Sequence, residues 1–133
     1  MKHLLRFSCS LLLALAVGCG SSERIVPPEQ PREQLALTEL SSLLRIFPKP
    51  PTKVDDFKLH QEAYPNACEA VRNGSVVVIW GVTMPGEGEL GKGTTDIVAY
   101  EKSAPTQGGF VLLHNGQVKK LSADEFNAAK KAK

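Results

Sequence analysis

The side chains best suited to covalent chemistry in the body of the chain are one cysteine and two histidines. Cys68 could act as a thiolate nucleophile if His60 or His114 served as its base. Nothing near Cys68 in the sequence orients an imidazole toward it, and a lone histidine is more often a solvated or satisfied residue than a catalyst. We therefore expect a buried, inert Cys68 and no catalytic residues. A Cys68-dependent enzyme is the alternative.

The segment 86–95 is rich in glycine and charge, and it nearly fits two nucleotide-binding patterns. Its glycines and Lys92 have the spacing of a phosphate-binding loop, but Gly93 stands where a serine or threonine should bind magnesium. A strand rather than a helix is expected next, so the favourable field of a helix N-terminus is missing. Glu87 and Glu89 would also repel a pyrophosphate. We expect no nucleotide and no other cofactor.

The same segment is a candidate binding loop. Trp80, the only tryptophan, ends the most apolar predicted strand and leads into the loop, so its side chain either packs on the core or stands at the rim of a site. Glu87, Glu89 and Lys92 supply charges that either contact a partner or keep the loop soluble. The cysteine, histidine and carboxylate residues show no ligand spacing, so we expect no metal site.

A chain of 133 residues, 42% of them hydrophobic and 23% charged, has room for one small domain, which excludes a large multidomain enzyme. Its formal net charge of +2 depends on Lys2 and Arg6, which lie in a segment that we expect to be removed. The rest of the chain is neutral. Because nucleic-acid binding calls for a basic surface, we expect no nucleic-acid partner.

Residues 1–18 have the three parts of a signal peptide. Lys2 and Arg6 give a basic start, 11–17 is an apolar run, and small residues follow. The apolar part is too short to span a bilayer, whose hydrocarbon core takes about 20 apolar residues. We expect this segment to direct export and then to be removed.

The sequence Leu-Ala-Val-Gly-Cys at 15–19 resembles the lipobox of bacterial lipoproteins. The resemblance implies cleavage between Gly18 and Cys19, and acyl chains such as palmitate on Cys19 that anchor the protein in a membrane. Ala16 departs from the pattern, which most often has leucine there. Gly20 is not the aspartate that retains such proteins at the inner membrane. The resemblance therefore favours the outer membrane, with the protein facing the periplasm or the cell exterior.

Residues 19–31 lack helical and strand periodicity and should form a disordered tether. After them, 32–133 should fold as one α+β domain, a small antiparallel β-meander of three or four strands with two or three packed helices. Helices are predicted at 32–46, at about 65–73 and from 123 onward, with a short one starting at Asp55, and strands at 76–80, 96–100, 110–113 and 117–121. Strand 76–80 should be buried on both faces, and Asn115-Gly116 should form a hairpin turn.

Part of this predicted sheet has Ala-Tyr-Glu-Lys at 99–102, then two glycines, a short apolar strand and a turn at Asn115. With these motifs, 96–120 resembles the C-terminal hairpin of prepilin-like proteins of planctomycete-type bacteria. The chain has Asn115 where the family usually has aspartate and Gln117 where it usually has histidine. It also lacks the long apolar N-terminal helix through which pilin subunits assemble. The resemblance supports the sheet and implies a structural subunit as an alternative function.

Together these patterns predict a lipid-anchored protein of the cell envelope, of binding or structural type. Its expected contacts are the membrane, through acyl chains on Cys19, and an envelope protein or a wall component. The alternatives are a Cys68-dependent envelope enzyme and a prepilin-like structural subunit.

Overall fold

The computed structural model describes residues 29–89 and 91–133. The expected signal peptide, the cleavage site and Cys19 lie outside the described residues, as do Leu90 and most of the expected tether. The elements are the α-helices α1 (Arg32–Arg45), α2 (Pro65–Asn73), α3 (Ala104–Gln107) and α4 (Ala123–Ala128), the 3₁₀ helices η1 (Val54–His60) and η2 (Glu87–Glu89), and the strands β1 (Val76–Val78), β2 (Ile97–Glu101), β3 (Gly109–Leu113) and β4 (Val118–Leu121). Within these two ranges, no helix has the length and apolarity needed to cross a membrane.

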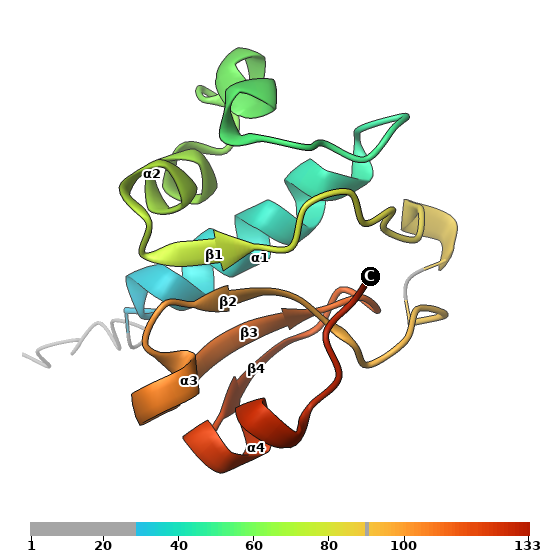
Figure 1. Ribbon diagram of the computed structural model, residues 1–133. Helices are drawn as coiled ribbons and strands as arrows, with labels where there is room; N and C mark the ends of the chain where they lie inside the picture. Colours follow the sequence, from blue (N-terminus) through green and yellow to red (C-terminus); the bar gives the residue numbers. More distant parts are fainter. Residues whose placement is uncertain (1–28, 90) are drawn as a thin grey trace, which may run out of the picture.

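The four strands form one antiparallel sheet in the order β1-β2-β3-β4. This confirms the predicted α+β class and the meander (Figure 1). The hairpin turn is also confirmed, because Gly116 has φ +87° and its N–H donates to the carbonyl of Leu113 at 2.8 Å. The short helix α3 is an addition that the sequence patterns do not predict.

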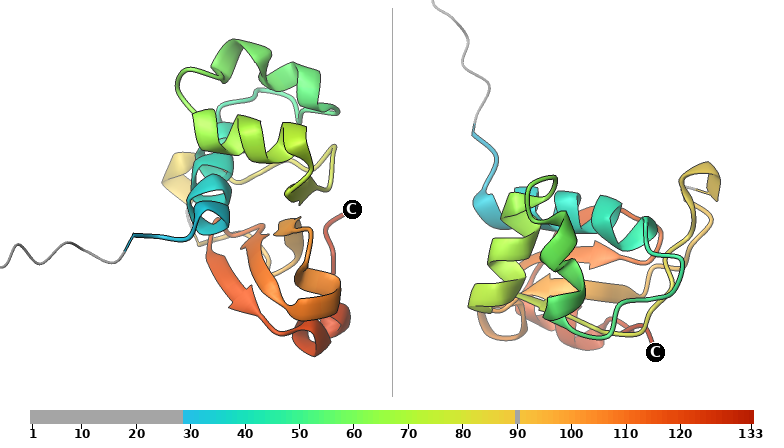
Figure 2. Two further views of the ribbon diagram at one scale, coloured as in Figure 1. Left: turned by 90° about the vertical axis from the view of Figure 1, so that its left-hand side faces the viewer. Right: turned by 90° about the horizontal axis from the view of Figure 1, so that it is seen from above.

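Helices cover both faces of the sheet, and β3 shows how the core is divided between them. Phe110 and Leu112 pack on the side of α1 and α2, whereas Val111 and Leu113 pack on the side of α3 and α4. This alternation is the period of two that a strand imposes on its side chains. Figure 2 shows the same arrangement from two sides, with the sheet between the two groups of helices.

Helix α1 supplies the largest apolar face that meets the sheet. Apolar residues recur along it at spacings of three and four, and the buried ones are Ala36, Leu37, Leu40, Leu43 and Leu44. Glu33 in its first turn and Arg45 in its last turn complement the helix dipole. Ser41 fixes the helix to the hairpin turn, since its hydroxyl donates to the carbonyl of Gly116 at 3.4 Å.

The N-terminus of α2 is capped by a side chain of α1. Tyr64 precedes the helix without a capping hydrogen bond, and Pro65 lacks an N–H. The Glu39 carboxylate accepts the next two backbone N–H groups, from Asn66 at 2.9 Å and from Ala67 at 3.0 Å, and also the Asn66 side-chain amide. One residue of α1 thus satisfies the free donors of α2 and holds the two helices together.

The connector before α2 forms η1, and its N-cap is Lys53, two residues before the predicted N-cap Asp55. Asp56, not Asp55, closes its start by accepting hydrogen bonds from the N–H groups of Thr52 at 2.8 Å and Lys53 at 3.3 Å. The hydrogen bond from the Thr52 N–H, with a smaller effect of that from Lys53, lowers the pKa of the Asp56 carboxyl. Phe57 of η1 is buried against the core, whereas Leu59 is 94% exposed.

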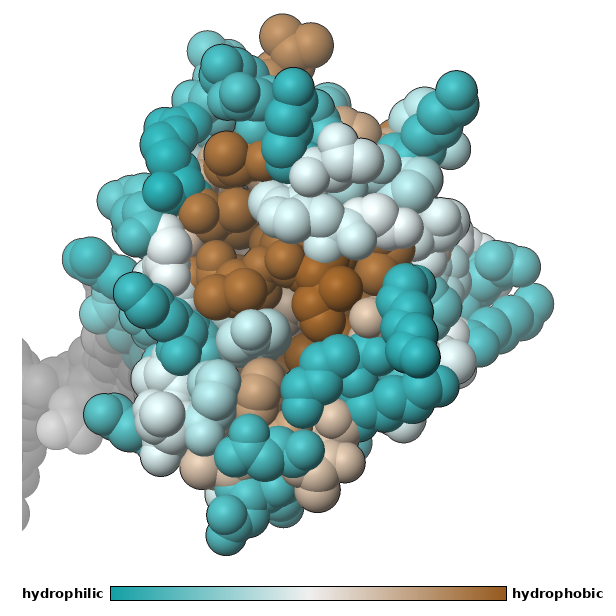
Figure 3. Space-filling model, in the orientation of Figure 1, coloured by the Kyte–Doolittle hydropathy of each residue, from teal (hydrophilic) through white to brown (hydrophobic). Residues whose placement is uncertain are grey.

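Strand β1 corrects the prediction of a five-residue strand buried on both faces. It covers only Val76–Val78, lies at the edge of the sheet and leaves Val77 half-buried. Figure 3 shows apolar surface over β1. The strand stops because Gly81 turns the chain away with φ +82° and donates its N–H to the carbonyl of Pro51 at 3.0 Å.

The C-terminal segment takes the place beside β2 that β1 leaves. The Ile97 N–H donates to the carbonyl of Lys130, and the Ala132 N–H donates to the carbonyl of Ile97, both at 2.9 Å. These two bonds make a short parallel bridge between Ile97 and Lys131. The Lys131 ammonium in turn donates to the carbonyl of Phe126 in α4 at 2.6 Å and to that of the C-cap residue Ala129 at 2.8 Å.

The start of α4 confirms the predicted capping box. Ser122 accepts the N–H of Glu125 at 3.2 Å, and the Glu125 carboxylate accepts the N–H of Ser122 at 2.8 Å. Phe126 is buried, as the sequence predicts.

Helix α3 forms a corner between β2 and β3 that depends on Glu101. Its carboxylate accepts the Ser103 hydroxyl at 2.8 Å and the Phe110 N–H at 3.0 Å. A Cβ on Gly109 would lie 2.6 Å from the same carboxylate, so a larger residue at this position would displace the Glu101 side chain. The chain ends α3 at Gly108 with φ +76°.

Replacing Glu39 by alanine tests the cap between helices. The variant leaves two backbone donors of α2 without their acceptor, and we expect it to lower the free energy of unfolding by about 1–2 kcal/mol, as loss of an N-terminal cap does. The measurement is urea unfolding followed by circular dichroism. Glu69→Ala on the exposed face of α2 is the matched control, with an expected change within about 0.5 kcal/mol. Equal stabilities of the two variants would contradict the cap.

Candidate functional site

The structure divides the predicted binding residues between two places. Glu89 and Lys92 line an open cleft of about 380 Å³ together with His114. The other lining residues are Thr83, Met84, Pro85 and Gly93. Glu87 is the first residue of η2, and neither Glu87 nor Trp80 lines the cleft. We call the cleft and η2 the loop surface.

His114, which follows β3, contacts two separate parts of the connection between β1 and β2, one at Thr83 and one at Thr94. Its Nδ1 atom lies 3.1 Å from the backbone nitrogen of Thr94, and its Nε2 atom lies 2.8 Å from the carbonyl oxygen of Thr83. The backbone N–H is always a donor and the carbonyl oxygen always an acceptor. Nδ1 is therefore the acceptor and Nε2 carries the proton, which makes His114 a neutral imidazole with a fixed tautomer.

The end of the loop also packs directly on the hairpin turn. Two backbone bonds connect them, from Asn115 N–H to the carbonyl of Thr94 at 3.0 Å and from His114 N–H to the carbonyl of Asp96 at 2.9 Å. A Cβ on Gly93 would lie 2.6 Å from the His114 carbonyl oxygen and 2.8 Å from backbone atoms of Asn115. Gly93, which stands where a phosphate-binding loop has serine or threonine, is thus a glycine because two backbones meet there.

The middle of the loop is organised by the short helix η2. The N–H of Glu89 donates to the carbonyl of Gly86 at 2.9 Å, and the N–H of Lys92 donates to the carbonyl of Glu89 at 2.9 Å. The side chains of Glu87, Glu89 and Lys92 are exposed, so both signs of charge are available to a partner. After Gly91 and Gly93 the chain leads into strand β2, as the sequence predicts, and not into an α-helix whose N-terminus could bind a phosphate.

Trp80 belongs to an aromatic cluster on the other side of the connection. Its ring is half-buried and lies 5.5 Å from that of Phe57, which is in turn 5.9 Å from that of Phe47. His60 completes the cluster, edge-on to Phe47 at 5.2 Å. Of the two roles considered for Trp80, the structure shows packing on the core.

Cys68 is buried in α2, with 3% of its surface exposed. Its thiol faces the carbonyl of Phe57 with the sulfur 3.9 Å from the oxygen. Removal from water raises the pKa of the Cys68 thiol. In the part of the chain that the structure describes, no hydrogen bond joins Cys68 to His60 or His114. This environment disfavours the thiolate on which a nucleophilic cysteine depends.

A metal centre would need several ligand side chains at one point. Among residues 29–89 and 91–133, no three histidine, cysteine, aspartate or glutamate side chains gather in this way.

The roles of His114 and Gly93 were missed in the sequence because their contacts are distant along the chain. His114 bonds Thr94 and Thr83, which are 20 and 31 positions away. A glycine within a glycine-rich stretch gives no local sign that a second backbone lies against it. The hairpin signal at Asn115-Gly116 identifies the turn but not the segment that packs on it.

Replacing Gly93 by alanine tests the contact between loop and turn. The added methyl group meets backbone atoms that cannot move aside as a side chain can, and we expect a loss of about 1–3 kcal/mol in the free energy of unfolding. Gly88→Ala is the control in the same loop, because a Cβ there has no neighbour within 4 Å. It should change stability by less than about 0.5 kcal/mol. A Gly93→Ala variant as stable as Gly88→Ala would refute the contact.

The thiol of Cys68 should react slowly while the protein is folded. Because burial raises its pKa, little thiolate forms at neutral pH, and the reagent also lacks access. We expect N-ethylmaleimide to modify Cys68 at least about tenfold faster in urea than in the native state. Mass spectrometry of the peptide that contains Cys68 gives both rates. Rapid modification of the native protein would revive the hypothesis of a catalytic cysteine.

Comparison with known proteins adds no family to this description. No protein-family model, no curated protein and no solved structure matches the chain. The two resemblances that rest on short motifs, at 15–19 and 96–120, stay predictions.

Proposed function

We propose that this protein is a lipid-anchored protein of the cell envelope, of non-catalytic type, which binds an envelope protein or a wall component through the loop surface. Acyl chains on Cys19 would hold it in the outer membrane, and the loop surface would meet the partner.

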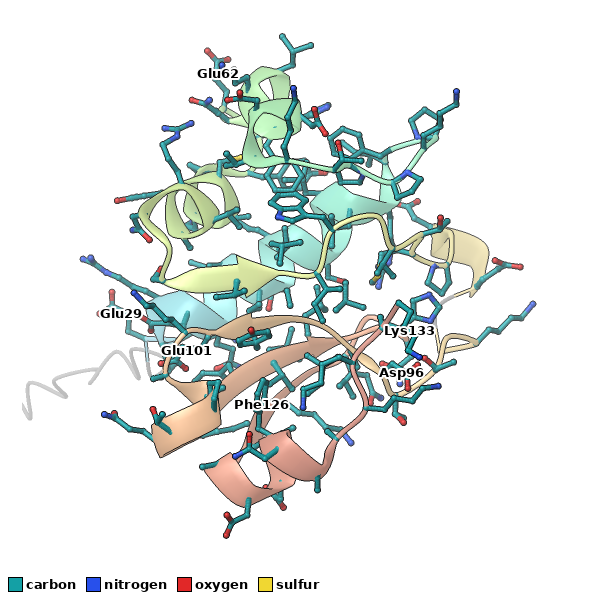
Figure 4. The ribbon with its side chains drawn as sticks, in the orientation of Figure 1. Glu29, Glu62, Asp96, Glu101, Phe126 and Lys133 are labelled. Atoms are coloured by element: carbon teal, nitrogen blue, oxygen red, sulfur yellow. The ribbon has the colours of Figure 1, made fainter. Side chains whose placement is uncertain are left out.

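The observation that carries this proposal is the position of the loop surface relative to the start of α1. In Figure 1, α1 begins at one end of the domain and η2 lies at the other. Figure 4 agrees, with Glu29 and Glu101 near the first end and Asp96 and Lys133 near the second. A domain that is held by the segment before α1 would therefore point its loop surface away from the anchor.

The chemistry of the loop surface suits a polar partner. Glu87, Glu89 and Lys92 are exposed and present both signs of charge, and Met84 gives the cleft an apolar floor. The ends of the loop are fixed by His114 and by the hairpin turn. Binding residues are commonly found on loops that a rigid scaffold positions in this way.

Site-specific photo-crosslinking in the native host tests the partner. A photoreactive amino acid in place of Glu87 should capture a discrete adduct with an envelope protein or a wall fragment. The control is the same amino acid in place of Lys102, an exposed residue that lines a hollow together with Glu33 in the first turn of α1. Equal adducts at both positions, or none, would overturn the binding role. An adduct with a second copy of the chain would instead favour the structural-subunit alternative.

The anchor needs a separate test. The mass of the full-length product from its own host should equal that of Cys19–Lys133 plus acyl chains, and Cys19→Ala should release the protein from membranes. Retention of Met1, or cleavage without lipid, would refute the anchor and leave the crosslinking result to be judged by itself.

A further inference from the structure

In this structure, Nδ1 of His114 cannot take up a proton without losing the hydrogen bond that it accepts. Its Nδ1 accepts the Thr94 N–H at 3.1 Å, and its Nε2–H donates to the Thr83 carbonyl at 2.8 Å. When an imidazole becomes an imidazolium, both of its nitrogens are donors. The new proton on Nδ1 would then point at the N–H of Thr94, and two donors cannot share that contact.

We propose that His114 is a pH-responsive latch, which holds Thr83 and Thr94 together when neutral and releases Thr94 when protonated. The release would accompany uptake of a second proton by the His114 ring, because both nitrogens of an imidazolium are donors. The proposal concerns the conformation of the loop and does not depend on the proposed function.

Few charged groups surround the imidazole. Glu89 and Lys92 line the same cleft, one of each sign. Asp96, whose carbonyl accepts the backbone N–H of His114, pairs its carboxylate with the Lys130 ammonium at 3.4 Å. Among the described residues, none of these side chains makes an ion pair or a hydrogen bond with the ring. In the described part of the chain, an imidazolium within the closed latch would thus have no ion pair with an anionic side chain.

The Thr94 hydroxyl does not remove the conflict. Its oxygen lies 3.5 Å from Nδ1, at the limit of a hydrogen bond, and it already accepts the N–H of Asp96 at 3.3 Å. Even if the hydroxyl accepted the new proton, the Thr94 N–H would lose its partner. The closed geometry is therefore specific for the neutral ring.

Release of Thr94 would affect neighbouring contacts in a defined order. The N–H of Asn115 donates to the carbonyl of Thr94, so this hydrogen bond should weaken next, together with the packing of Gly93 on the turn. The bond from Nε2–H to Thr83 has the same donor and acceptor in both protonation states and should persist. Acid should therefore loosen one end of the loop while β3 and β4 stay paired.

Nuclear magnetic resonance of the full-length protein gives the primary test without any substitution. Near pH 8, the ring ¹⁵N shifts of His114 should show an unprotonated Nδ1 and a protonated Nε2. Amide exchange, normalised to the intrinsic rate at each pH, should show that protection of Thr94 and Asn115 falls by about three- to tenfold when His114 takes its second proton, the factor expected for loss of one hydrogen bond. Protection of Leu112 should not change.

Two variants separate the latch from general acid effects. His114→Asn places an amide oxygen near the position of Nδ1, where it accepts the Thr94 N–H at every pH, and we expect the pH response of Thr94 to disappear. His60→Gln removes the histidine that packs on Phe47 and should leave that response unchanged. The proposal fails if native Thr94 is equally protected before and after His114 is protonated, or if Nδ1 carries the proton of the neutral ring.

Discussion

The burial of β3 between two helical layers is the constraint on which the rest of the domain depends. Its side chains alternate between the two halves of the core, and Val111 and Leu112 are both fully buried, so a shift of its register by one residue would exchange the two halves. The register also sets the position of the residue after the strand. His114 comes directly after Leu113, and its place beside the loop between β1 and β2 is therefore fixed by the packing of β3.

Elements that are encoded by neighbouring residues could be predicted from the sequence. Gly74 caps the end of α2, Gly116 forms the hairpin turn, and the capping box begins α4. In each case a few adjacent residues determine the backbone conformation. The burial of Cys68 is also encoded by a local pattern, its place on the apolar face of α2. Local chemistry of this kind accounts for most of the fold.

The features that were not predicted depend on contacts between distant segments. Strand β1 is short because Gly81 bonds to Pro51 and because the C-terminal segment pairs with Ile97. Glu39 caps a helix that begins 26 positions later. Of the candidate site, the charges of the loop were identified correctly as a surface feature. Two other features could not be inferred without the fold. Trp80 lies apart from the charged residues of the loop, and His114 bonds to two parts of that connection.

The pairing of the C-terminal segment with Ile97 has a consequence for how the molecule behaves among its own copies. The open side of a strand is a template for intermolecular pairing, and β2 would present such a side wherever β1 does not reach. There the backbone groups of Ile97 are hydrogen-bonded to those of Lys130 and Ala132. The side chains of Lys130 and Lys133 add positive charge to the same segment. By pairing with Ile97, residues 130–132 thus cover the edge of β2 that the short strand β1 leaves open, which disfavours edge-to-edge aggregation of the sheet.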